Sequence, residues 1–98
     1  MNENGLPPIH PGQFLQELLQ ELGLSQAGLA RALGTSAMRI SHVVRGKRPV
    51  TAELALLLGR ALGQSPQYWL NLQATYDLKT AEAVLGDQLK TIPELAHI

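Results

Sequence analysis

The 98-residue sequence contains no cysteine. Disulfide frameworks and thiolate metal sites are therefore excluded, and a reducing, cytoplasmic location is expected. The first residues show no basic segment followed by an apolar run, so no signal peptide is expected. No unbroken apolar stretch approaches the length of a membrane span, so no membrane partner is expected either. Apolar residues nevertheless make up 45% of the chain, which is enough for the core of one compact domain.

Residue types that catalyse reactions or hold metals are few and scattered. The three histidines, His10, His42 and His97, have no cysteine companions and no spacing typical of metal ligands. Ser41 and His42 are neighbours on a predicted helix and point in different directions, which is wrong for a nucleophile and its base. The sequence therefore predicts no enzyme, no catalytic residue, no metal site and no cofactor.

Acidic residues are absent from residues 23–50, whereas this segment holds five of the eight Lys and Arg residues. The formal net charge is zero because residues 1–22 carry −3 and residues 51–98 carry −2, against +5 in between. Positive charge concentrated in this way favours a polyanionic partner. A merely solvated basic face is the alternative, and the complete lack of acids in the segment weakens it.

Apolar spacing together with start and stop signals predicts an all-α fold of five helices plus a tail. Residues 1–9 contain Asn, Gly and two prolines and are expected to form an irregular arm. The predicted helices span residues 11–22, 26–33, 36–45, 52–62 and 66–85. The residues expected to cap their starts are Ser25, either Thr35 or Ser36, Thr51 and Ser65. The tail is the segment that follows Gly86.

The two short helices around Gly34 have the spacing of a helix-turn-helix. Ala30 is small where a crossing helix needs close approach, and Gly34 can adopt the left-handed conformation of the turn. Ile40 and Val43 then point to one face of the second helix. Residues 10–63 are therefore predicted to form a DNA-binding bundle. Helical hairpins without a DNA function are the alternative, and these offsets disfavour it.

In a helix-turn-helix the second helix enters the major groove of DNA. The residues of that helix predicted to face base edges are Ala37, Met38, Ser41 and His42. The residues predicted to contact phosphates are Gln26, Ser36, Arg39, Arg45, Lys47 and Arg48. Met38 as a core residue and His42 as a solvated residue stay open as alternatives.

The fifth predicted helix carries more large apolar residues than one buried face needs. This surplus predicts that one stripe packs on the bundle and another on a second copy, which assigns residues 64–98 to dimerisation. The candidate dimer residues are Trp69, Leu70, Leu72, Tyr76 and Leu78. Complete burial within one chain is the alternative. The order of residues 79–98 is left open.

Residues 10–78 resemble the HigA antitoxins, a branch of the Xre-type (Cro/CI-like) helix-turn-helix proteins with a lambda-repressor-like fold. The segments that carry the resemblance are His10-Pro-Gly, Gly23-Leu-Ser-Gln-Ala, Gly34-Thr-Ser, Gly46-Lys-Arg and Ser65-Pro-Gln-Tyr-Trp-Leu-Asn-Leu-Gln. The last segment is the most specific, because generic Xre repressors share only the helix-turn-helix.

The resemblance implies a homodimer that binds operator DNA in its own promoter and represses a toxin–antitoxin operon. It also implies a HigB-like ribonuclease toxin, which cleaves mRNA, as a partner. Operator contacts carried over from the family fall on Gln26, Ser36, Ala37, Met38, Arg39 and His42, and backbone clamping falls on Lys47 and Arg48. Ala37 and Met38 depart from the Gln, Arg or Asn of many relatives, so shape and methyl contacts are expected to supplement hydrogen bonds. A stand-alone Xre-type repressor without a toxin is the alternative.

Overall fold

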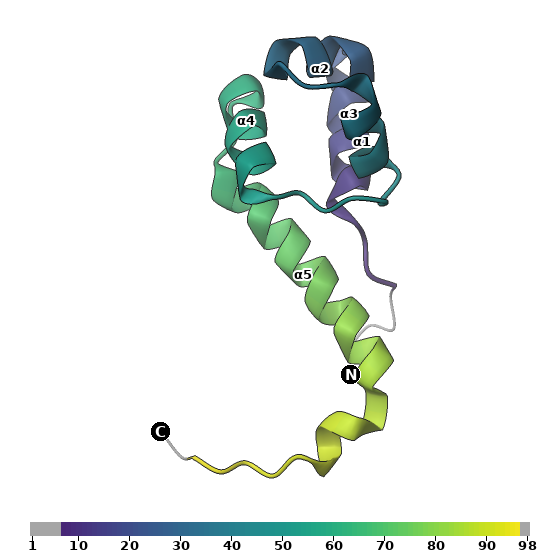
Figure 1. Ribbon diagram of the computed structural model, residues 1–98, viewed down its shortest axis with the longest axis vertical. Helices are drawn as coiled ribbons and strands as arrows, with labels where there is room; N and C mark the ends of the chain where they lie inside the picture. The colour runs from purple at the N-terminus through teal and green to yellow at the C-terminus, as the bar shows by residue number, and fades with distance from the viewer. Residues whose placement is uncertain (1–6, 97–98) are drawn as a thin grey trace.

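The computed structural model describes residues 7–96. Within them the chain forms five α-helices and a final 3-10 helix, and no strand (Figure 1). The elements are α1 (Pro11–Leu22), α2 (Gln26–Leu33), α3 (Ala37–Val44), α4 (Ala52–Leu62), α5 (Pro66–Leu85) and η1 (Gly86–Thr91). The predicted all-α, five-helix fold is confirmed, and η1 is an element that the sequence did not predict. Most of the predicted N-terminal arm, residues 1–6, lies outside the described residues.

Local hydrogen bonds explain where each helix begins. Each of the five α-helices starts after a residue whose side chain accepts a backbone N–H of the first turn. These residues are His10, Ser25, Ser36, Thr51 and Ser65. The choice between Thr35 and Ser36 falls on Ser36, whose Oγ accepts the N–H of Arg39 at 3.1 Å. His10 is a cap that the sequence did not predict.

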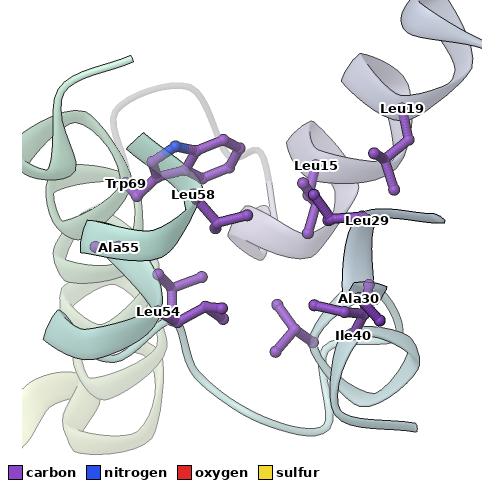
Figure 2. Close-up of a cluster of buried hydrophobic side chains, with 11 residues drawn as sticks. Leu15, Leu19, Leu29, Ala30, Ile40, Leu54, Ala55, Leu58 and Trp69 are labelled. Carbon is purple, nitrogen blue, oxygen red and sulfur yellow. The ribbon is translucent and has the colours of Figure 1, made fainter. Parts of the chain in front are cut away.

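All five helices contribute to one buried apolar cluster (Figure 2). Its members are Leu15, Leu19, Leu29, Ala30, Ile40, Val43, Val50, Leu54, Ala55, Leu58 and Trp69. Trp69, from α5, has no exposed surface and lies in the same cluster as Leu15 and Leu58. The first turns of α5 therefore contribute to the core of the bundle.

The start of α1 lies directly against the end of α3. A Cβ atom at Gly12 would overlap the carbonyl oxygen of Val43, so only glycine permits this approach. Both Pro11 and Gly12 are buried at this contact. The close approach places the N-terminal end of α1 beside the segment that leaves α3.

The outer part of α5 extends away from the bundle and carries η1 at its far end (Figure 1). The longest dimension of the described chain is 49 Å because of this projection. Large apolar side chains are exposed along it and along the segment that follows: Leu78, Val84, Leu85, Leu89, Ile92 and Leu95. Within residues 7–96, no helix combines the length and the hydropathy that a membrane span requires.

Candidate nucleic-acid interface

The turn between α2 and α3 has the geometry of a helix-turn-helix. Gly34 adopts a left-handed conformation with φ of 72°. The N–H of Thr35 donates to the carbonyl of Ala30 at 2.9 Å, which closes the end of α2. Ala30 and Ile40 are both buried where the two helices pack. The predicted motif and the role of its structural residues are therefore confirmed.

The outward face of α3 carries the four residues predicted to read bases. Ala37 is exposed and Met38 is 67% exposed, so the alternative that Met38 fills the core is wrong. Ser41 and His42 are half-buried and follow on the same helix. The arrangement offers apolar groups at the start of α3 and polar groups one turn later. Their contact with DNA remains a prediction.

The residues predicted to contact phosphates lie at two helix starts and at the end of α3. Gln26 stands in the first turn of α2, and its Nε2 donates to Oε1 of Gln16 on α1 at 3.4 Å. Ser36 caps α3. Helix N-termini offer unpaired backbone N–H groups and the positive end of the helix dipole, and both favour a phosphate. Arg45 is exposed directly after α3.

Arg39 has a partner that the sequence did not reveal. Its Nη2 donates to Oε1 of Glu53, in the first turn of α4, at 2.9 Å. The fold therefore brings an acid to a segment that contains none. The positive charge of residues 23–50 is thus partly compensated in the folded chain.

Residues 46–48, which we call the basic loop, form a tight turn that closes back on α3. The carbonyl oxygen of His42 accepts the backbone N–H of Lys47 at 2.8 Å and that of Arg48 at 3.2 Å. Gly46 makes the turn possible with φ of 76°, a conformation that other residues rarely adopt. Both backbone donors are thus used inside the protein. The basic loop offers phosphates its exposed Lys47 and Arg48 side chains rather than its amides.

Two buried polar residues, His10 and Gln73, lie behind the basic loop. They line a pocket of about 190 Å³ together with Gly46, Lys47, Arg48, Pro49, Tyr76 and Asp77. Nδ1 of His10 accepts the N–H of Gly12 at 2.9 Å, and the ring meets that of Tyr76 edge-on at a centroid distance of 4.9 Å. Burial lowers the pKa of His10, although a backbone hydrogen bond to Arg48 and the charge of Asp77 oppose this effect.

Sequence reasoning gave neither His10 nor Gln73 a role. Both residues stand in the segments that carry the family resemblance, which was the available signal. Their partners lie on other elements of the fold, and for this reason the sequence alone did not connect them.

The residues predicted to form a dimer surface have different environments. Trp69 has no exposed area, so its assignment to a dimer surface is wrong. Leu70 and Leu72 are half-buried against the core, and half-buried Tyr76 packs on His10. Leu78 is 66% exposed. Of the five, Leu78 offers the most free apolar surface, and it begins the exposed series that continues along outer α5.

The site residues offer side chains and backbone groups that can bind an anionic partner. No three His, Cys, Asp or Glu residues within residues 7–96 gather where a metal ion could be held. The surface that the site residues share combines positive side chains, helix N-termini and small or apolar groups on one exposed helix. This combination suits a polyanion whose grooves admit a helix.

Comparisons with known proteins agree with this geometry. A helix-turn-helix family model matches residues 15–69. Virulence-associated protein I of Dichelobacter nodosus is 49% identical over 81 residues, which cover 82% of this chain and 75% of that protein. Antitoxin HigA-1 of Vibrio cholerae is 36% identical over 72 residues, which cover 72% of this chain and 68% of the antitoxin. The solved structure of Pseudomonas aeruginosa antitoxin HigA with higBA promoter has a TM-score of 0.84 and 44% identity, and the match covers 92% of this chain and 99% of that one.

Proposed function

Because the chain belongs to the helix-turn-helix family of DNA-binding regulators and HigA-like antitoxins, we propose that it is the antitoxin of a type II toxin–antitoxin module. In this role a homodimer binds an operator in its own promoter, represses the operon and neutralises a HigB-like mRNA-cleaving toxin. The family is one of binding proteins and is not an enzyme class. The exposed face of α3 beside the basic loop carries the DNA-binding part of the proposal, and the similarity to HigA antitoxins supports the antitoxin part.

DNA binding divides between two sets of residues. The start of α3 enters the major groove, where exposed Ala37 and Met38 contact thymine methyl groups and His42 reaches a base edge. Arg45, Lys47 and Arg48 contact phosphates on either side and fix the orientation of α3. Because the start of α3 offers few hydrogen-bonding side chains, part of the sequence preference comes from the shape of the DNA. The promoter in the similar HigA structure supports DNA as the partner.

A homodimer supplies the second half of the binding site. One α3 spans only a few base pairs, whereas two copies place their recognition helices about 34–36 Å apart, one turn of DNA. The outer part of α5 and the segment after it supply an apolar surface for this contact, because Leu78 and Val84 are 66% and 81% exposed. An apolar surface of this kind is typical of a protein–protein interface.

The toxin is proposed to bind outside the DNA-binding face. Residues 51–98 carry a formal charge of −2, whereas residues 23–50 carry +5. The family resemblance implies a small basic ribonuclease, and such a toxin is attracted to the acidic part of the chain and repelled by the basic part. The name of the similar Vibrio cholerae protein, antitoxin HigA-1, supports a toxin partner.

Co-expression with the small open reading frame next to the gene tests the proposal. We expect the chain to restore growth to cells that express this neighbour and to co-purify with it. We also expect the purified chain to shift a fragment of its own promoter more strongly than a scrambled fragment. A promoter shift without growth rescue or complex would instead favour a stand-alone repressor. Growth rescue without a promoter shift would contradict autorepression.

A further inference from the structure

The basic loop is fixed from behind by polar groups of two other helices. At the end of the segment that follows the loop, the N–H of Val50 donates to Oε1 of Gln73 on α5 at 2.7 Å. Nε2 of Gln73 in turn donates to Oδ1 of Asp77 at 2.9 Å, which holds the amide in this orientation. Val50 and Gln73 are both buried. The chain that leaves the basic loop is thus attached to α5.

The middle of the basic loop is attached to the start of α1 through His10. Nδ1 of His10 accepts the N–H of Gly12, so the ring proton of the neutral histidine is on Nε2. The backbone of Arg48 also lies close enough to the ring to raise the pKa of His10, against the effect of burial. A Cβ at Gly46 would lie 3.5 Å from Cγ of His10, so the loop crosses directly over the ring.

These contacts point to a function in DNA binding rather than in packing alone. Gln73 binds the main chain at Val50, and the ring of His10 lies against Gly46, whereas Lys47 and Arg48 are exposed. A short loop that contains glycine samples many conformations unless it is held. Fixing it in the free protein removes an entropy cost that DNA binding would otherwise have to offset.

We propose that His10 and Gln73 are positioning residues that hold the basic loop ready for phosphate binding by attaching it to α1 and α5. This proposal rests on the proposed binding of DNA. Loss of either anchor leaves every DNA-contacting side chain in place but lets the loop move. Affinity for DNA then falls, whereas the dependence of affinity on salt stays unchanged because the number of phosphate contacts in the complex is the same.

Gln73→Leu tests the anchor on α5 in the full-length chain. The variant cannot accept the N–H of Val50, and we expect its affinity for a promoter fragment to fall about fivefold to tenfold with an unchanged salt slope. Amide hydrogen exchange at Val50, followed by NMR, should accelerate. Leu62→Ala is the matched control, because it removes half-buried apolar packing at the end of α4. It should keep slow exchange at Val50 and wild-type affinity under conditions in which both variants are folded.

The double variant Gln73→Glu/Asp77→Asn tests whether the hydrogen bonds themselves matter. The new carboxylate can accept both the N–H of Val50 and the amide of the new asparagine, and the net charge is that of the wild type. We expect affinity within twofold of the wild type and slow exchange at Val50. This variant also supplies the test if Gln73→Leu fails to fold, because faster exchange at Val50 with full affinity would then overturn the proposal.

His10→Asn separates the anchor on α1 from the helix cap. Asparagine can still accept the N–H of Gly12, but it is too short to reach the backbone of Arg48. We expect a loss of affinity of about fivefold and greater mobility of the Lys47 and Arg48 amides in NMR relaxation.

Two results would overturn the proposal: equal losses of affinity in Gln73→Leu and Leu62→Ala, or wild-type affinity in both Gln73→Leu and His10→Asn. Failure of the proposed DNA function would look different, because the wild-type chain itself would then not bind the promoter.

Discussion

Arg39 of the recognition helix and Glu53 in the first turn of α4 form an ion pair, with 2.9 Å between Nη2 and Oε1. Glu53 lies 14 residues away from Arg39 in sequence and outside the helix-turn-helix. Its carboxylate would compete with a DNA phosphate for the same guanidinium. The free protein therefore holds one of the predicted phosphate-contacting residues in an intramolecular pair.

Replacing Glu53 by Gln should strengthen DNA binding. The change releases Arg39 and removes a negative charge near the proposed interface, so we expect several-fold tighter binding at low salt and a salt slope steeper by up to about 0.9 per chain. The side chain of Glu53 is 73% exposed, so the loss of the pair should change the free energy of unfolding by no more than about 1 kcal/mol. Fluorescence anisotropy at several salt concentrations measures the effect. Glu82→Gln on exposed α5 is the control, and equal effects of the two substitutions would contradict the role of the pair.

Replacing Lys47 and Arg48 together by Ala should weaken binding to every DNA sequence. Each lost phosphate contact lowers the salt slope by about 0.9, so the double variant should lose about 1.8 per chain. Arg60→Ala/Lys79→Ala produces the same change in net charge outside the interface and should leave the slope near that of the wild type. If the two double variants have the same slope, then the basic loop does not contact phosphates.

Aspartate in place of the exposed apolar residues of outer α5 should separate the proposed dimer. We expect Leu78→Asp/Val84→Asp to sediment as a monomer and to bind a half-site with nearly the affinity of the wild type, but a full operator much more weakly. Leu56→Asp also places a charge at an exposed leucine, 61% exposed on α4, and should remain dimeric. A dimer that persists in the first variant and is lost in the second would place the interface on α4.

The stability of the chain should fall as the pH decreases below the ordinary pKa of histidine, 6.5. Burial lowers the pKa of His10 in the folded state, so the unfolded chain binds more protons in this range. The free energy of unfolding therefore increases with pH. The contribution of His10 to the stability is thus fully present above pH 6.5 and is lost as the pH falls toward the pKa of His10 in the folded state. Protonation would also place a proton on Nδ1, which accepts the N–H of Gly12.

Thermal unfolding between about pH 7 and pH 5.5 measures this effect. The groups that face the ring are Asp77 and Tyr76 on α5 and the Lys47 and Arg48 segment. His10→Asn should show a flatter dependence on pH. Parallel curves for the two proteins would contradict the role of His10.

Helix starts and ends could be predicted from the sequence because their signals are local. Ser25, Thr51 and Ser65 each bond to an N–H three residues ahead, and the glycines that follow α1, α2 and α4 need only their own left-handed conformation. The spacing around Gly34 fixed the motif for the same reason. Neighbours in sequence determine these features, so no knowledge of the fold was needed.

The contacts of His10 and Gln73 behind the basic loop could not be predicted, because they depend on packing between segments that are distant in sequence. Val50 and Gln73 are 23 residues apart, and neither has a local pattern that identifies the other. The dimer assignment failed at Trp69 for a related reason. Apolar residues surround much of α5, so their spacing does not show which stripe faces the core and which faces solvent.

Because α5 projects beyond the bundle, a small change in its direction displaces its far end. The helix contacts the bundle as far as Tyr76, and nine residues at 1.5 Å each extend about 14 Å further to Leu85. A rotation of about 10° at this contact would displace Leu85 by roughly 2 Å. In a dimer held at the outer ends of two such helices, the direction of α5 would therefore set the separation of the two recognition helices. The spacing of operator half-sites would then be determined by residues that never touch DNA.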